Sequence, residues 1–233
     1  SLDPSQIIDG KAKRTLANRS MAEAVTYSFL SSQHALLFGG GKDELKLMNP
    51  ISSDLDEMRP SIIPNLISSA LKNSNMGNSD IAIFEVGPQY ADASAEGQQV
   101  VAAGIRTGQT AARHWSNVSR SVDVFDVKGD VVALLEVLGV PVANLQTTVD
   151  APNWYHPGRS GVLRLGPNAL AYFGEIHPTV LRAMSVDYPI MAFEVFLNNL
   201  HSPRSKGPNR ALLKLEPLQT VKRDFAFILD KEI

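Results

Sequence analysis

Apolar residues recur along this chain with two different periods. Runs that alternate, or that are rich in Val, Thr, Tyr and Phe, predict β-strands. They cover residues 23–30, 45–48, 81–86, 100–107, 145–149, 161–165, 170–176 and 191–197. Helical spacing and end signals predict helices at 4–20, from 32 to the glycines at 39–41, at 64–75, 131–138 and 178–184. Because strands come in runs with helices inserted irregularly, the pattern favours an α+β fold, a mostly antiparallel sheet flanked by helices.

The pattern after residue 200 indicates a change of domain. Residues 201–209 combine two prolines, a glycine and two basic residues, which is typical of a linker. Residues 224–230 alternate again and predict one more strand, which cannot bury a face alone. We therefore expect an N-terminal helix and connector (1–22), a main domain (23–200), a linker (201–217) and the truncated start of a second domain (218–233).

Composition narrows the class of protein. The 233 residues are 44% apolar and 20% charged, as in ordinary globular domains, and no run is long enough to cross a bilayer. The absence of cysteine excludes disulfides and thiolate metal sites. A formal net charge of -2 argues against a main nucleic-acid grip, since the concentrated basic stretches are only 11–14 and 204–210. We expect a cytoplasmic protein with no membrane partner.

The familiar motifs of catalysis and cofactor binding do not occur. The Gly39–Lys42 stretch lacks the first glycine and the hydroxyl residue of a phosphate-binding loop, so we interpret it as a surface turn. The five histidines lack the spacing of a zinc site, and no Gly-x-Ser-x-Gly elbow presents a serine. We therefore predict no catalytic residue, cofactor or metal ligand in this chain.

Two stretches carry the residue types that bind partners. Trp154, Tyr155, His156 and Arg159 surround a Pro-Gly pair, and Trp, Tyr and Arg are the usual anchors of interfaces. The stretch is either a partner-binding loop or a rigid turn whose aromatics cap the core and whose arginine meets a carboxylate. Residues 55–61 are either an anion-binding approach to a helix start, or a cap by Ser61 beside a surface ion pair of Asp56 with Arg59.

Five motifs, in order along the chain, resemble the β chains of bacterial phenylalanine–tRNA ligases. They are Met-Arg-Pro-Ser-Ile-Ile-Pro-Asn-Leu at 58–66, Ile-Phe-Glu-Val-Gly at 83–87, Val-Phe-Asp-Val-Lys-Gly-Asp at 124–130, Tyr-His-Pro-Gly-Arg-Ser at 155–160 and Phe-Gly-Glu-Ile-His-Pro at 173–178. Each motif alone is weak, but the series is specific. With Arg59 and His177 from these motifs, our candidates for a partner surface are Arg59, Trp154, Tyr155, His156, Arg159 and His177.

The resemblance implies the fold of a class II aminoacyl-tRNA synthetase core. It also implies a heterotetramer of two α and two β chains, in which the α chain charges tRNA with phenylalanine using ATP and magnesium. Residues 221–227 look like the first strand of the family's ferredoxin-like anticodon-binding domain. The family's editing, tRNA-binding and magnesium-binding modules precede the stretch that this chain resembles, so we expect tRNA to bind mostly outside it.

The same resemblance predicts that this copy of the fold is catalytically inactive. Class II sites hold the ATP phosphate with an arginine two residues before a glutamate on an antiparallel strand. If Glu85 marks that strand, the arginine position holds Ile83, which has no donor. The second anchor, a Gly-x-Gly-x-x-Arg helix start, is not found after Gly161. We expect a non-catalytic domain that supports the α chain.

Two alternatives from other classes stay open at this point. The first is a stand-alone class II-like ligase for a small carboxylic acid, with Arg106, Arg159 or Arg164 converging on a buried pocket. The second is an RNA-binding module that uses the basic stretches at 11–14 and 204–210, and whose binding would depend steeply on salt.

Overall fold

The computed structural model describes residues 3–112, 114–116, 118–200 and 222–231. The chain divides into two units, residues 1–201 and 202–233. Within the second unit, residues 222–231 are exposed and form no strand, so the strand predicted at 224–230 is wrong for these residues. The predicted linker at 201–217 lies outside the described residues.

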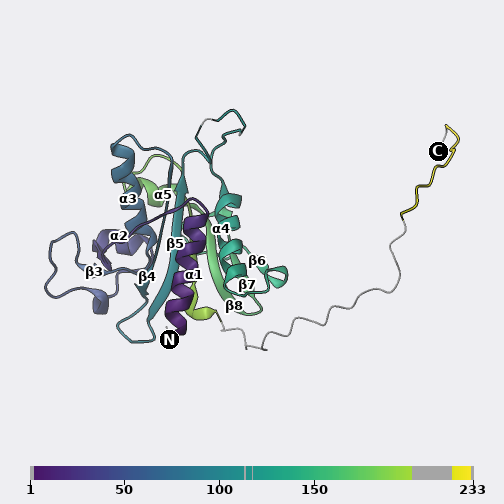
Figure 1. Cartoon of the computed structure of the whole chain (residues 1–233). Coiled ribbons are helices and arrows are strands. Elements are labelled where there is room, and N and C mark those ends of the chain that lie inside the picture. Colours follow the sequence, from purple (N-terminus) through teal and green to yellow (C-terminus); the bar gives the residue numbers. More distant parts are fainter. Residues whose placement is uncertain (1–2, 113, 117, 201–221, 232–233) are drawn as a thin grey trace. The chain divides into compact units, whose positions relative to one another are not determined.

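The first unit is built on a mixed sheet of seven strands (Figure 1). In spatial order these are β1 (Ala22–Glu23), β4 (Ile81–Tyr90), β5 (Gln98–Thr107), β9 (Met191–Phe196), β8 (Asn168–Ile176), β7 (Tyr155–Leu165) and β6 (Gln146–Thr148). Every neighbouring pair is antiparallel except β1 with β4. The predicted α+β class with a mostly antiparallel sheet is confirmed.

Helices cover both faces of this sheet. One face, called here the α3 face, is covered by α2 (Ser32–Leu37), α3 (Ile63–Asn75) and α5 (Pro178–Ala183). The other, the α4 face, is covered by α1 (Pro4–Asn18) and α4 (Val124–Val137). A two-stranded sheet pairs β2 (Phe29–Leu30) with β3 (Glu57–Met58). Among the described residues, no helix has the length and apolarity needed to cross a bilayer.

Strict alternation within the strands produces two separate cores. On β4, Ile81 and Ile83 belong to the core of the α3 face, whereas Ala82 and Phe84 belong to that of the α4 face. A side chain on Gly104 of β5 would lie 2.5 Å from the ring of Phe193. Glycine is therefore required where β5 and β9 pack at this level.

Capping explains why α4 begins at Val124 and not at 131 as predicted. The Asp123 side chain accepts hydrogen bonds from the backbone N–H groups of Phe125 and Asp126, and Asp126 bonds back to the Asp123 N–H. Arg120 adds an ion pair to Asp126. These contacts hold the first turn, in which Phe125 is exposed, so hydrophobic periodicity did not reveal it.

Three other predictions were wrong. The strand at 23–30 exists only at its ends, as β1 and β2, because the residues between them leave the sheet. Residues 45–48 form the end of a 3-10 helix (Asp43–Leu45) and an isolated bridge, not a strand. The stretch around Pro157 and Gly158, expected to be a binding loop or a rigid turn, is largely the start of β7, where these two residues occupy an irregularity in the pairing with β8.

Candidate functional site

A row of polar residues crosses the α3 face of the sheet. Ala103 on β5 lies between two glutamates, opposite Glu85 on β4 on one side and Glu194 on β9 on the other. On its other side, Glu194 lies opposite Tyr172 on β8. Both carboxylates are buried. A buried carboxylate needs a cation, hydrogen bonds or a proton, so the partners of these two decide what the face can do.

The segment that covers this row supplies those partners. Glu57, Arg59 and Ser61 alternate along an extended stretch that leads into α3, and all three are buried. Glu57 accepts a hydrogen bond from the backbone N–H of Gly41 at 2.6 Å. Alternation of polar residues before an apolar helix is the sequence signal that could have placed this segment against the sheet.

The Arg59 side chain is buried, and its guanidinium binds groups inside the protein. Its Nη1 lies 2.9 Å from Oε1 of Glu85 and donates to Oγ1 of Thr26, and its Nε donates to the carbonyl of Pro88. Only 1% of the arginine is exposed. The surface pair of Arg59 with Asp56, one of the two alternatives for this stretch, is wrong, because the covering segment faces the sheet. The partner contact expected of Arg59 stays a prediction. Asp56 instead accepts from the N–H and hydroxyl of Ser32, which lowers the pKa of its carboxyl.

Glu194 has hydrogen-bond partners but no cationic one among the described residues. Ser61 Oγ donates to its Oε1 at 2.7 Å, and Tyr155 lies with its hydroxyl 3.0 Å from Oε2. The indole N–H of Trp154 is close enough to favour the charged form, although its geometry falls short of a hydrogen bond. Burial outweighs these contacts and raises the pKa of Glu194. Burial likewise raises the pKa of Tyr155, and the partner contact expected of this buried residue stays a prediction.

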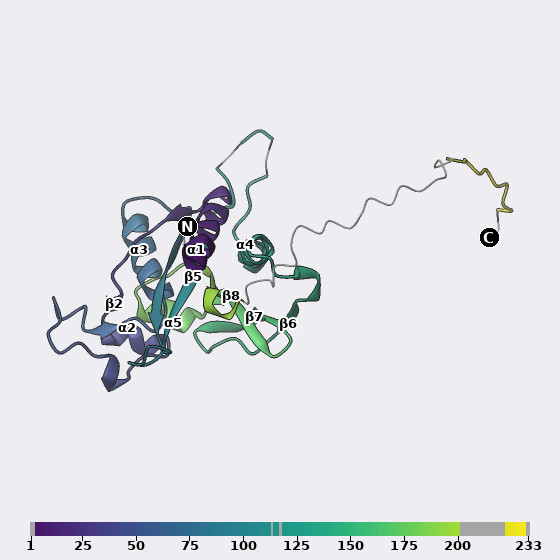
Figure 2. The same cartoon turned by 60° about the horizontal axis from the view of Figure 1, so that its bottom comes forward.

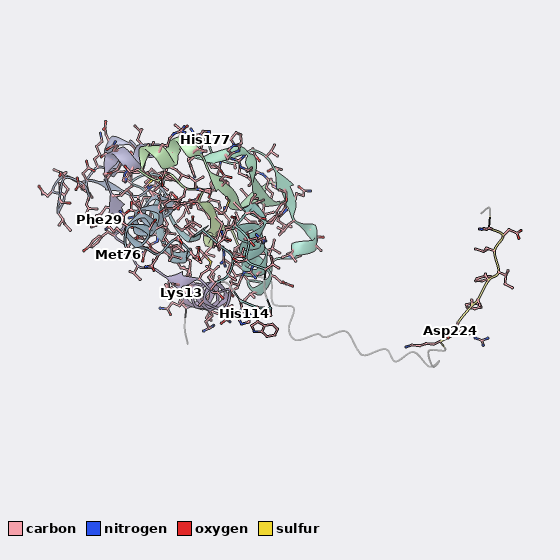
Figure 3. All side chains as sticks on the ribbon, turned by 90° about the horizontal axis from the view of Figure 1, so that it is seen from above. Lys13, Phe29, Met76, His114, His177 and Asp224 are labelled. Carbon is pink, nitrogen blue, oxygen red and sulfur yellow. The ribbon has the colours of Figure 1, made fainter. Side chains whose placement is uncertain are left out.

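A second polar group lies at the surface, where β7 and β8 pair beside α5. The rings of His156 and His177 stack with centroids 6.0 Å apart, and Arg159 binds Glu175 through two hydrogen bonds of 2.5 and 2.9 Å. The backbone bond from the His177 N–H to the Trp154 carbonyl joins the two motifs that the sequence singled out. His177 is at the edge of the folded unit in the view from above (Figure 3).

Hydrogen bonds from backbone N–H groups fix the tautomer and the orientation of these two histidine rings. Nδ1 of His156 accepts from the N–H of Gly158 at 3.0 Å, and Nδ1 of His177 accepts from the N–H of Thr179 at 3.2 Å. In the neutral rings the proton therefore resides on Nε2, which is left as a hydrogen-bond donor. Such a pair can donate to acceptors of a partner, so His156 and His177 stay predicted partner-surface residues.

The contacts of Trp154 and Arg159 agree in part with the second alternative given for this stretch, in which the aromatics cap the core and the arginine meets a carboxylate. Trp154 is half-buried against Phe38, with centroids 5.9 Å apart, and Arg159 meets the carboxylate of Glu175. About half of the Arg159 side chain is exposed. A partner contact by these two residues remains a prediction that concerns their exposed edges only.

The three arginines of the ligase alternative do not converge on one pocket. Arg106 binds Asp130 on the α4 face, Arg159 binds Glu175 at the β7–β8 end, and Arg164 binds Asp150 near β6. Ile83 is a half-buried apolar residue on the same face as Glu85, and the guanidinium beside Glu85 comes from Arg59. Across the described ranges, no group of three or more His, Asp or Glu side chains could hold a metal ion.

Comparison with known proteins decides the family. Residues 1–197 match the family described as the phenylalanyl tRNA synthetase beta chain CLM domain. The chain belongs to this family. The resemblance seen in the five sequence motifs is thereby confirmed.

Relatives of this phenylalanyl-tRNA synthetase β-chain domain support the assignment. Over 230 residues it is 50% identical to the phenylalanine–tRNA ligase β subunit of Rhodospirillum rubrum and 46% identical to that of Paramagnetospirillum magneticum. Each match covers 98% of this chain and 29% of the relative. The domain therefore spans less than a third of the length of these relatives.

Solved structures confirm the fold of this β-chain domain. PylSc of Desulfitobacterium hafniense, a pyrrolysyl tRNA synthetase, superposes with a TM-score of 0.63 at 13% identity. The match covers 84% of this chain and 65% of that chain. The architecture is that of a class II tRNA synthetase-like core, as the motifs implied.

Proposed function

We propose that this domain is a non-catalytic structural part of the β subunit of phenylalanine–tRNA ligase. It supports the α subunit in the ATP-dependent charging of tRNA with phenylalanine, within a cytoplasmic assembly of two α and two β chains. The observation that carries the proposal is the family match over residues 1–197. ATP, magnesium and tRNA are handled mostly by parts of the ligase outside this domain.

The chemistry of the α3 face supports a non-catalytic role. Stabilising a developing phosphate charge requires donors that are free to face the ligand. The guanidinium beside Glu85 already donates to Glu85, Thr26 and the Pro88 carbonyl, and it is buried beneath the covering segment. Ile83, at the position expected to hold an ATP-binding arginine, offers no donor.

The exposed features of the same face suit a scaffold that meets other protein surfaces. An open groove of about 930 Å³ runs between residues 25–34 and the outer side of α3. Its wall includes the stacked rings of Tyr27 and Phe29, with centroids 5.3 Å apart. Together with the surface histidine pair, this groove offers contact area without a cluster of catalytic groups.

The direct test measures partner capture and nucleotide binding side by side. The purified chain is immobilised and exposed to the α subunit of the same ligase, and ATP binding to the chain alone is measured by equilibrium dialysis. We expect capture of the α subunit, no ATP binding, and no phenylalanine-dependent exchange of pyrophosphate into ATP. Formation of an adenylate by the chain alone would contradict the non-catalytic role, and failure to capture the α subunit would contradict the scaffold role.

A further inference from the structure

The connection between β5 and α4 projects from the folded unit as a long excursion, residues 108–122 (Figure 2). Its two sides are joined at the base by a bridge between Gln109 and Ser121. Thr110 donates its backbone N–H to the carbonyl of Arg120 at 2.8 Å, and the Gln109 N–H donates to Asp80 at 2.9 Å. Hydrogen bonds therefore hold the base in place, and they preorganise the side chains at the tip of the excursion for binding.

The excursion carries large apolar side chains in water. Trp115 is 93% exposed at the tip and Val118 is 94% exposed on the returning side, and Phe125, in the first turn of α4, is 72% exposed. The His114 ring lies 5.6 Å from the Trp115 ring, and Nδ1 of His114 is 2.8 Å from the Ser116 hydroxyl. Tryptophan is highly buried on average. An exposed tryptophan on a loop whose base is fixed by hydrogen bonds therefore indicates an interaction site.

The pairing of Arg120 and the residue types of the excursion favour a protein over a nucleic acid as its partner. The guanidinium of Arg120 lies 2.8 and 2.7 Å from the two carboxylate oxygens of Asp126 and 3.4 Å from Asp123. These contacts engage the Arg120 guanidinium with two carboxylates, so it is not free to bind a phosphate backbone. Val118 also cannot stack on a base, whereas an aliphatic and two aromatic side chains together suit an apolar pocket.

The course of the chain favours a separate subunit over the rest of the β polypeptide. The excursion leaves β5 after Thr107, at the end of the sheet where Arg106 lies opposite Met191. The last strand, β9, finishes at Phe196, opposite Val101, at the other end of the sheet. The excursion and the last strand therefore end on opposite sides of the folded unit (Figure 1).

The N-terminal helix leads to the same conclusion. Arg106 Nη2 donates to the carbonyl of Arg19, so α1 ends close to the base of the excursion. Pro4, at the start of α1, is then about 20 Å away along the helix axis. The start of α1 and the end of β9 therefore both lie at the end of the unit away from the excursion.

We propose that Trp115, with Val118 and Phe125, is an anchor that inserts into an apolar pocket on the α subunit. The inference rests on the proposed function, because it takes the α subunit as the partner. Burial of an interface tryptophan is commonly among the largest contributions to affinity, so loss of this side chain is expected to weaken the complex by about 30-fold or more.

The test compares the affinity of the α subunit for the whole chain and for variants. Trp115→Ala is expected to raise the Kd by about 30-fold or more, and Trp115→Phe by less. Val149→Ala, which truncates an apolar residue that is 83% exposed away from the excursion, is the matched control and is expected to bind like the parent chain. Because Trp115 is exposed, its variants should unfold at the parent's denaturant midpoint.

A spectroscopic readout locates the contact independently. The chain has two tryptophans, so labelling with 5-fluorotryptophan yields two fluorine resonances, and Trp115→Phe identifies the one from Trp115. We expect that resonance to shift when unlabelled α subunit is added.

The outcomes separate this inference from the function on which it rests. If the parent chain does not bind the α subunit, both are overturned. If the parent binds and Trp115→Ala binds equally well, the anchor is overturned and the scaffold role stands. If tRNA alone shifts the Trp115 resonance, with an effect that falls steeply with salt, the excursion is a nucleic-acid contact and the inference is wrong.

Discussion

At the scale of single residues, the unusual group is the carboxyl of Glu194. It lies in an apolar core with two hydroxyl partners, and no cation among the described residues compensates its charge. Removing a carboxylate from water without a counterion favours the protonated form. The residue nevertheless has a structural use, since it links Ser61 before α3 to Tyr155 on β7 through β9.

The raised pKa of Glu194 predicts a pH dependence of stability. Burial raises the pKa above the ordinary value of 4.5, so between the unfolded and folded pKa values the folded state holds a proton that the unfolded state has lost. The group's contribution to the free energy of unfolding is therefore complete below the unfolded pKa and declines as the pH rises through the folded one. Glu194→Gln should flatten this decline as the pH rises above the ordinary value of 4.5, measured by urea unfolding at a series of pH values.

A matched control uses a glutamate that makes no such contacts. Glu136 is exposed on α4, so Glu136→Gln should leave the pH profile of unfolding unchanged. A Glu194→Gln profile that runs parallel to the parent's would show that the carboxyl is charged in the folded protein.

At the scale of elements, the segment from β3 to α3 is docked on the sheet by polar contacts. Arg59 joins it to Glu85 on β4 and to Thr26 after β1. Gly87 makes room for this arrangement, because a side chain there would lie 2.8 Å from Nη2 of Arg59. Removing one member of such a pair costs more than replacing both, since the remaining charge is left buried and unpaired.

Two variants test this docking. Arg59→Met should lower the free energy of unfolding by about 3–5 kcal/mol, and Arg59→Met combined with Glu85→Met should recover much of that loss. Lys46→Met, which breaks the exposed pair of Lys46 with Asp43, should leave the denaturant midpoint nearly unchanged. A double variant as unstable as Arg59→Met would mean that packing, and not the unpaired carboxylate, causes the loss.

At the scale of the folded unit, Asp130 joins three elements. Its buried carboxylate lies 2.6 Å from Nε of Arg19 at the end of α1 and 2.6 Å from Nε of Arg106 on β5. Asp130 itself belongs to α4, so these two contacts join α4 to the end of α1 and to β5 of the sheet. Arg106 directly precedes Thr107, from which the excursion with Trp115 departs, so this junction also positions the proposed anchor.

Neutralising the junction should destabilise the unit as a whole. Asp130→Asn leaves two guanidinium groups without a counterion, and we expect a loss of about 3 kcal/mol in the free energy of unfolding by guanidinium chloride. Asp150→Asn provides the comparison, because the pair of Asp150 with Arg164 is largely exposed, and its midpoint should barely move. Equal effects of the two substitutions would contradict the importance of burial at Asp130.

Local signals in the sequence were sufficient for much of the fold and for the family. Hydrophobic periodicity placed α3, α5 and most of the seven strands of the large sheet within a few residues, because it reports which side of an element is buried. The series of five motifs identified the family because each motif keeps its residue types and its order along the chain.

Tertiary structure alone decided the roles of the candidate residues. Arg59 and Tyr155 have the residue types of an exposed interface, but another segment covers them, and no local pattern reports what lies above a residue. His156 and His177 meet only because β7 pairs with β8. Trp115 is distinctive only in its exposure, which depends on how far the excursion stands from every other element. Periodicity is a property of one element, whereas burial and juxtaposition are properties of the packed molecule, which is why the sequence revealed the first and only the structure the second.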